Sequence, residues 1–210
     1  MLKPAYTRNA QKAVGGMPKG DAAQLVSPIN TYAADPSTPN IDVDRVKGRQ
    51  GVDRLRWGRW RALFRVEDGE MRIYQIEHRP GGVPMTQNEP KPAELSRRNS
   101  VADLERRLDE AEDAYDALAM RLAEIEHVVS GGEWVPGEVV DRLIAGDHPI
   151  RVWREHRGLK SQDLARQAGI SSALLSEIEN GKKEGSIKTL AALGRALRVD
   201  LDDPVPWPRG

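Results

Sequence analysis

Five basic side chains in the first third of the chain have the types and the spacing to bind phosphate oxygens. Arg54 and Arg56 alternate along one expected strand, Arg61 lies on the next, and Lys47 and Arg79 lie near the two ends of the same region. Guanidinium groups bind phosphate through planar, paired hydrogen bonds, so a nucleic-acid backbone is the natural ligand for such residues. The alternative is an ordinary solvated sheet face that happens to be basic.

An antiparallel sheet is expected to position these residues. Apolar and polar residues alternate with period two over 52–57, 59–66 and 71–78. Gly58 and Asp68-Gly69 provide tight turns between these segments, which predicts a three-stranded meander. A short strand over 3–8 and helices over 9–14 and 21–34 come before it. We therefore expect an α+β unit in which two helices pack on a small antiparallel sheet.

The middle strand of the meander is expected to have two different faces. Trp60, Ala62, Phe64 and Val66 lie on one face, which would pack against the helices. The other face would be free of helices and would carry the arginine face, which we define as Arg54, Arg56, Arg61 and Arg65.

This segment resembles the RelE/HigB toxin family over residues 1–83. The resemblance rests on Lys47-Gly48, on VDRLRWGRWRALFRV from Val52 to Val66, and on IYQIEHR from Ile73 to Arg79. It implies a ribosome-dependent mRNA endonuclease or, in the ParE branch, a gyrase inhibitor.

The resemblance also implies roles for the five cations. Arg61 and Arg79 would hold the scissile phosphate, and Lys47, Arg54 and Arg56 would support them. The family pattern continues with a tyrosine a few residues after the position of Arg79, but this chain reads PGGVPM over 80–85. The enzymatic state of the domain is therefore left open.

A linker and a heptad helix follow. Residues 84–98 are rich in proline and polar side chains, which is typical of a linker. Over 99–130 the apolar residues recur at gaps of three and four, as in a coiled coil. We define the α-helical seam as Leu104, Leu108, Ala111, Tyr115, Leu118, Leu122 and Ile125.

Charge gives this helix two possible partners. With Val101 at heptad position a, Arg107 and Arg121 precede Glu112 and Glu126 by five residues, as in a parallel homodimer. The helix is also acidic, and it could instead lie on the arginine face and cover it. A packed amphipathic helix with neither role is the third possibility, and the first two can hold together.

Composition limits the remaining function classes. The 32 basic and 32 acidic residues cancel, and the chain has no cysteine, which excludes disulfides, cysteine-based zinc sites and thiol catalysis. We expect no cofactor and no metal site. No apolar run reaches the length of a membrane span and no signal peptide is recognisable, so we expect a cytoplasmic protein without membrane contact.

The last third of the chain carries the signals of a helix-turn-helix. Helices are expected over 136–145, 150–157, 162–168, 172–180 and 187–198. Ser161, Ser171 and Ser186 are placed to cap three of them, and Gly169 is placed to make the tight turn. The core spacing of Leu164, Ala165, Ile170, Leu175 and Ile178 agrees with this register.

This region resembles the Xre/Cro repressor family, and in particular HigA-like antitoxins. The resemblance rests on PIRVWREHRGL from Pro149, on Leu164-Ala165, and on ISSALLSEIENGK from Ile170. It implies a recognition helix in the major groove, with these residues at the DNA: Lys160, Gln162, Ser171, Ser172, Ala173, Ser176, Glu177, Lys182 and Lys183. It also implies that Arg154 and Glu179 form a structural pair.

The two resemblances together imply a toxin–antitoxin fusion. The expected parts are a toxin-like domain over 1–83, a linker over 84–98, the heptad helix over 99–130 and an all-α DNA-binding domain over 134–205, with the antitoxin resemblance spanning about 95–205. Such a chain would be a homodimer that binds operator DNA and represses its own promoter. The alternatives are an active endoribonuclease that meets mRNA and the ribosome, a gyrase inhibitor, and an interaction protein with a decayed enzyme domain.

Overall fold

The computed structural model describes residues 1–78 and 98–199, and for 98–103 it describes only the backbone. Its contacts divide the chain into two compact units. The first unit comprises Met1–Ala10 and Ser27–Trp134, and the second comprises Gln11–Val26 and Val135–Gly210. The expected linker over 84–98 lies outside the described residues except for the backbone of Arg98, and Arg79 lies outside them as well. The domain bounds given above stay predictions.

The N-terminal region contains the expected strands and helices and two further strands. They are β1 (Lys3–Thr7), α1 (Arg8–Gly15), α2 (Lys19–Ala34), β2 (Asp42–Arg45), β3 (Asp53–Trp57), β4 (Trp60–Glu67), β5 (Glu70–His78), α3 (Arg98–Val129) and β6 (Trp134–Pro136). The sheet has the order β2-β3-β4-β5-β1-β6. Strands β3, β4 and β5 form the predicted antiparallel meander, whereas β1 runs parallel to β5. The short strands β2 and β6 were not expected.

One face of the sheet packs on the second half of α2, as predicted. The ring of Tyr32 lies edge-on to that of Phe64, with 5.6 Å between the centroids. Ala62, Phe64 and Ile29 are fully buried in this layer. Val66 is an exception, because it is 44% exposed at the end of β4 beside the hairpin turn.

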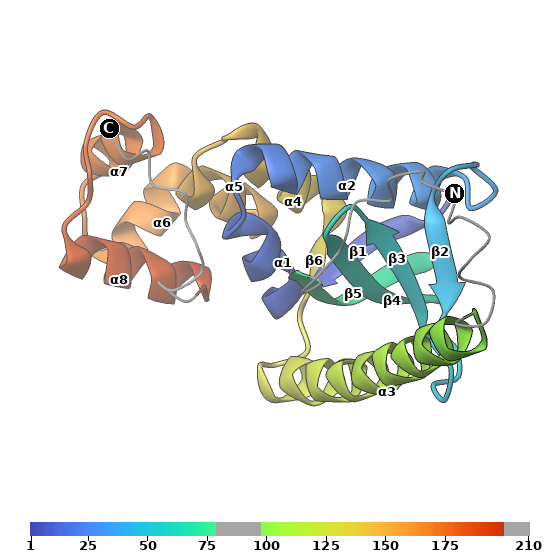
Figure 1. Ribbon diagram of the computed structural model, residues 1–210. Helices are drawn as coiled ribbons and strands as arrows, with labels where there is room; N and C mark the ends of the chain where they lie inside the picture. Colours follow the sequence, from blue (N-terminus) through green and yellow to red (C-terminus); the bar gives the residue numbers. More distant parts are fainter. Residues whose placement is uncertain (79–97, 200–210) are drawn as a thin grey trace. The chain divides into compact units, whose positions relative to one another are not determined.

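The opposite face was expected to be free of helices, and that expectation is wrong. Helix α3 lies across it, on the side of the sheet away from α2 (Figure 1). Met120 and Ala123 of α3 are buried against Val52, Leu63 and Tyr74 of the sheet region. This contact places α3 over the arginine face.

The second unit contains the C-terminal helices. They are α4 (Gly137–Ala145), α5 (Pro149–His156), α6 (Ser161–Ala168), α7 (Ser172–Glu179) and α8 (Ile187–Leu197). Helix α6 packs against α7 and α8, and α5 packs against α7 and α8 as well. The buried side chains of this bundle include Val152, Leu164, Leu175, Ile178 and Leu193. The chain is therefore a sheet region followed by an all-helical region, as the sequence predicts.

Candidate nucleic-acid interface

The strands bring the residues of the arginine face together as predicted, and carboxylates of α3 lie on that face. Arg54 on β3 and Arg61 on β4 are only 3% and 6% exposed at their side chains. Asp116 of α3 is fully buried between them. Its two carboxylate oxygens lie 2.5 Å from Arg54 Nη1 and 2.9 Å from Arg61 Nη1.

The next acidic residue of α3 meets the expected lysine. Asp113 Oδ1 lies 3.3 Å from Arg54 Nη2, and Asp113 Oδ2 lies 3.9 Å from Lys47 Nζ. Asp113 is itself buried, whereas the side chain of Lys47 is 78% exposed. Asp113 and Asp116 are one helical turn apart, so both carboxylates point to the same side of α3.

The edges of the arginine face are paired too. Arg56 Nη2 lies 3.4 Å from Glu112 Oε2, and Arg65 Nη2 lies 2.7 Å from Glu124 Oε1. Glu124 also contacts Arg49. The four predicted cations of this region that the structure describes, Lys47, Arg54, Arg56 and Arg61, therefore each lie within 4 Å of a carboxylate of α3.

Carboxylates of the sheet region complete the shell around the two buried guanidiniums. Asp44 on β2 accepts hydrogen bonds from Nε and Nη2 of Arg54, at 3.1 and 2.8 Å, and Glu77 on β5 accepts one from Arg61 Nε at 2.9 Å. Burial alone would lower the pKa of Arg54, but the hydrogen bonds to Asp44 and Asp116 outweigh it and raise that pKa. Arg54 is thus locked in the charged form.

The sequence indicates the cations and gives the acidic helix as one possible cover for them, but it does not indicate which acidic residues pair with them. Asp44, Asp113, Asp116 and Glu124 were not singled out as site residues. A usable signal was present in Asp113 and Asp116, because acidic residues three apart on a helix share a face. No local pattern shows which sheet residues they meet.

The helix-turn-helix has the predicted geometry. Ser171 caps α7, since its Oγ accepts a hydrogen bond from the backbone N–H of Leu174 at 3.1 Å. Gly169 ends α6 with a φ of 67°, in the left-handed region that favours glycine. Ser186 caps α8 in the same way as Ser171 caps α7. Ser161 does not cap α6 as expected, because the helix begins at Ser161 itself and Lys160 occupies the cap position.

The expected recognition surface on α7 is open. Ser171, Ser172, Ala173 and Ser176 are all exposed. Glu177 is half-buried, and its Oε2 lies 2.7 Å from Lys183 Nζ. Lys183 is therefore held beside α7 by Glu177, which the sequence did not indicate.

The expected phosphate contacts border this surface. Lys160, Gln162 and Lys182 are exposed at the start of α6 and after the end of α7. Arg166 on α6 is also exposed and is a cation that sequence reasoning did not select, and it pairs with Asp163. The exposed residues of α6, α7 and the segment after α7 thus include small polar groups and cations, the residue types that contact bases and phosphates of DNA.

A buried ion pair fixes α5 to α7. Arg154 Nε lies 2.7 Å from Glu179 Oε1, and Arg154 Nη2 lies 3.2 Å from Glu179 Oε2. Glu179 is 6% exposed. The hydrogen bonds to Glu179 raise the pKa of Arg154. The predicted structural pair is confirmed, and it fixes the orientation of α7 relative to α5.

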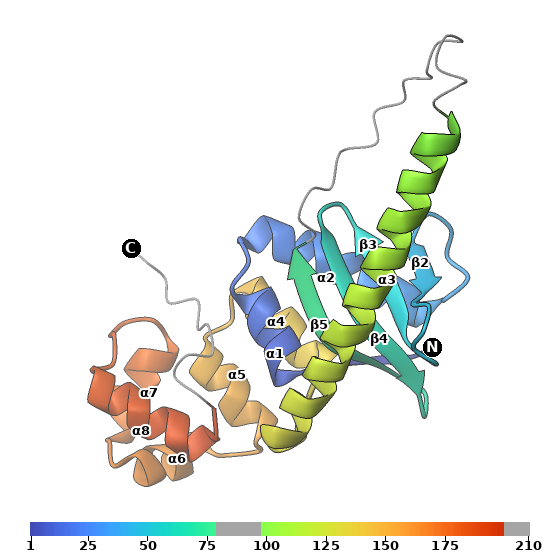
Figure 2. The same cartoon turned by 60° about the horizontal axis from the view of Figure 1, so that its bottom comes forward.

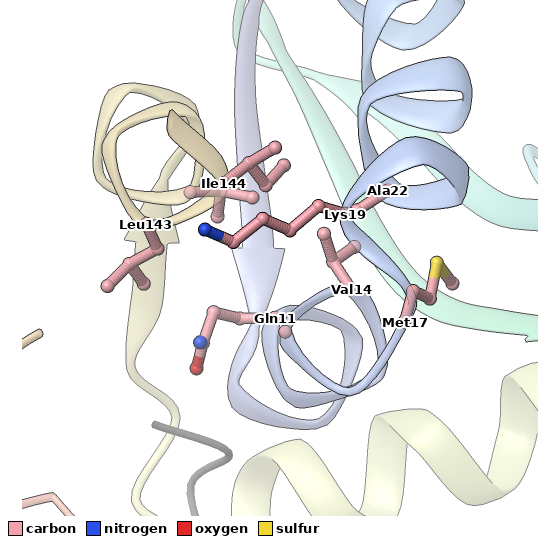
Figure 3. A pocket seen from close by; sticks show the side chains of 9 residues that line it. Gln11, Val14, Met17, Lys19, Ala22, Leu143 and Ile144 are labelled. Carbon is pink, nitrogen blue, oxygen red and sulfur yellow. The ribbon is translucent and has the colours of Figure 1, made fainter. Parts of the chain in front are cut away.

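A small cavity in the second unit does not offer an alternative site. It lies between α1, the start of α2 and α4, where Gln11, Val14, Lys19, Leu143 and Ile144 line it (Figure 3). Its volume of about 40 Å³ has room for a few water molecules and is too small for a nucleotide. Within residues 1–78 and 98–199, no three His, Asp or Glu side chains are grouped to hold a metal ion. In the same residues no helix combines the length and the apolarity of a membrane span.

Comparison with known proteins bears on the second unit. Residues 150–203 match a family model described as helix-turn-helix, of the Xre/Cro type. This match and the geometry of α6 and α7 support DNA binding and transcriptional regulation. No curated protein and no solved structure matches the chain.

Proposed function

We propose that this protein is a sequence-specific DNA-binding repressor that acts on its own promoter. The observation that carries the proposal is the exposed face of α7, capped by Ser171 and bordered by Lys160 and Lys182, in a segment that matches the helix-turn-helix family. A single reading helix covers only a few base pairs, so the operator should contain two half-sites about one helical turn apart.

The residues of α7 divide between reading bases and positioning the protein. Ser172 and Ser176 can donate to or accept from base edges, and Ala173 can contact a thymine methyl group. Lys160, Gln162 and Lys182 contact phosphates, which sets the register of the helix but carries no sequence information.

Binding to the promoter fragment tests this proposal. Fluorescence anisotropy of the full chain with its own upstream DNA should show tighter binding than with a shuffled fragment of equal length. Ser172→Ala should change the preference among operator variants, because it removes a group that reads bases. A promoter reporter should be repressed by the wild-type chain, and equal affinity for both fragments would count against the proposal.

A second function is favoured by the arginine face. We propose that this face is a nucleic-acid-binding surface of a RelE-like domain, which α3 keeps silent within the same chain. Its support is the set of ion pairs that Arg54 and Arg61 form with Asp113 and Asp116. In this proposal the carboxylates take the positions at which phosphate groups would otherwise bind.

The tether makes this inhibition strong. Two segments joined in one chain meet at an effective concentration in the ~mM range, so an RNA would compete with a carboxylate helix that is always present. The RNA would also have to displace Asp116 from a buried position, where ion pairs are screened little by salt.

The full-length variant Asp113→Asn/Asp116→Asn tests the second function. It removes two charges from α3 and keeps the side-chain volumes. We expect growth inhibition in cells, with mRNA cleavage in a translating extract for the ribonuclease branch or stalled supercoiling for the gyrase branch. Adding Arg61→Ala should abolish the effect. A folded variant that does neither would identify the domain as a decayed enzyme.

A further inference from the structure

The seam of α3 is exposed in the folded chain. Its large side chains are between 52% and 60% exposed, namely Leu104, Leu108, Tyr115, Leu118, Leu122 and Ile125. From Leu104 to Ile125 the helix rises about 32 Å, so the seam is a long apolar stripe. Contiguous apolar stripes of this kind mark contact surfaces on soluble proteins.

The packing of α3 is the reverse of that of an ordinary amphipathic helix. Such a helix turns its apolar stripe to its own core and its polar side to water. Here Asp113, Asp116 and Met120 face the sheet, and the seam faces away from it. The ion pairs with the arginine face account for the acidic side of α3. Within the described part of the chain, no packing contact buries the large side chains of the seam.

The N-terminal turns of α3 point to the same conclusion. Residues 104–111 are exposed on every side of the helix. Figure 2 shows these turns continuing beyond the strands of the sheet. A helical segment without tertiary packing is only marginally stable in water, so this part of α3 requires a partner to remain helical.

Charged residues beside the seam favour a second copy of α3, in parallel orientation, as that partner. Arg107 and Arg121 are exposed at heptad positions g, and Glu126 is exposed at a position e. Glu112, at the other position e, is largely buried and pairs with Arg56 of its own chain. In a parallel pair of α3 helices, Arg121 meets Glu126 of the other copy, five residues later in the sequence. In an antiparallel pair, e positions meet e positions and g positions meet g positions, which places glutamate near glutamate and arginine near arginine.

We propose that α3 joins two copies of this chain in parallel through the seam, while its acidic side stays on the arginine face of its own chain. Tyr115 links the two contacts. It lies at a seam position, its hydroxyl donates to Glu77 Oε2 at 3.1 Å, and its ring lies 4.8 Å from the guanidinium carbon of Arg61. The pairing does not rest on DNA binding or on toxin activity.

Measuring the mass of the full chain in solution tests the pairing. Wild-type protein should have the mass of a dimer in light scattering and sedimentation without DNA. Leu108→Lys places a charge in the seam and should raise the dissociation constant about tenfold or more. Asp109→Asn changes the net charge by the same amount one residue away, outside the seam, and should leave the dimer intact.

The dimer masses of these variants can be interpreted even if the stability of the fold changes. Leu108 is more than half exposed, so hydrogen exchange of the sheet and of the C-terminal helices should remain that of the wild type. A wild-type chain that is monomeric at micromolar concentration would overturn the proposal. So would a Leu108→Lys variant that dimerises as tightly as the wild type.

A single cysteine tests the orientation. The chain has no cysteine, so Leu104→Cys introduces one thiol near one end of the seam. In a parallel pair this position faces its own copy, and mild oxidation should link two chains. In an antiparallel pair the two thiols would lie at opposite ends of the seam. A dimer that does not cross-link would therefore contradict the parallel arrangement.

Discussion

Asp116 is the residue whose removal most directly perturbs the contact between α3 and the arginine face. The change Asp116→Asn keeps the shape of the side chain and removes its charge. Its carboxylate is fully buried and lies 2.5 Å from Arg54 and 2.9 Å from Arg61. The variant therefore leaves two buried guanidiniums without a carboxylate that they shared.

The structure gives a magnitude for this change. Removing one partner of a buried ion pair costs about 3–5 kcal/mol. Arg54 keeps Asp44 at 2.8 Å and Asp113 at 3.3 Å, and Arg61 keeps Glu77 at 2.9 Å. Because these carboxylates remain, we expect the lower end of that range, about 3 kcal/mol.

Hydrogen exchange is the suitable assay, because a chain of two units need not unfold in one step. Amides of α3 from residue 113 onward should exchange about 100-fold faster in Asp116→Asn, since 1.4 kcal/mol corresponds to a factor of ten. Glu110→Gln is the matched control, because Glu110 forms an exposed pair with Arg106 on the same helix. Such a pair contributes about 0.5 kcal/mol or less. Equal exchange of α3 in the two variants would refute the reasoning.

Four further outcomes are expected. Ser171→Ala should destabilise the helix-turn-helix by about 1 kcal/mol, measured by hydrogen exchange of the amides of α7, because it removes the cap of that helix. Arg154→Met should cost more, about 3 kcal/mol, because it leaves the buried Glu179 carboxylate without its guanidinium, and a loss equal to that of Ser171→Ala would count against a buried pair. Lys182→Ala should weaken binding to all DNA sequences alike and reduce the salt slope by about one, which titrations at several salt concentrations measure. Burial, and then the charge of Arg72, lower the pKa of His127 from its ordinary value of 6.5, so the neutral form stabilises the fold above pH 6.5. The free energy of unfolding should therefore fall as the pH drops below 6.5. The variant His127→Gln should make that free energy less dependent on pH in this range.

The helix-turn-helix could be predicted because its signals are local. Ser171 and Gly169 act within one turn of where they stand in the sequence, and Leu175 and Ile178 follow the helical period. The meander could be predicted for the same reason, since Gly58 and Asp68-Gly69 separate segments of period two.

The position of α3 could not be predicted, because two sides of this helix attract partners. Its seam has the pattern of a coiled coil, and its other side carries Asp113 and Asp116. Which side of α3 packs on the sheet depends on Arg54 and Arg61, which are more than fifty residues away in the sequence. No local pattern shows whether distant ion pairs or the apolar seam will decide the packing. Strand β2 was missed because Asp42–Arg45 has one apolar residue and no alternation, and it matters because Asp44 pairs with Arg54.

An equilibrium titration of the full chain with its own promoter fragment shows whether the C-terminal helices bind DNA in a sequence-specific way. We expect binding that is tighter than to a shuffled fragment and that weakens with salt, and a footprint in which the bases contacted by α7 are protected. Affinity that is the same for both fragments at every salt concentration, with no protected bases, would contradict this expectation.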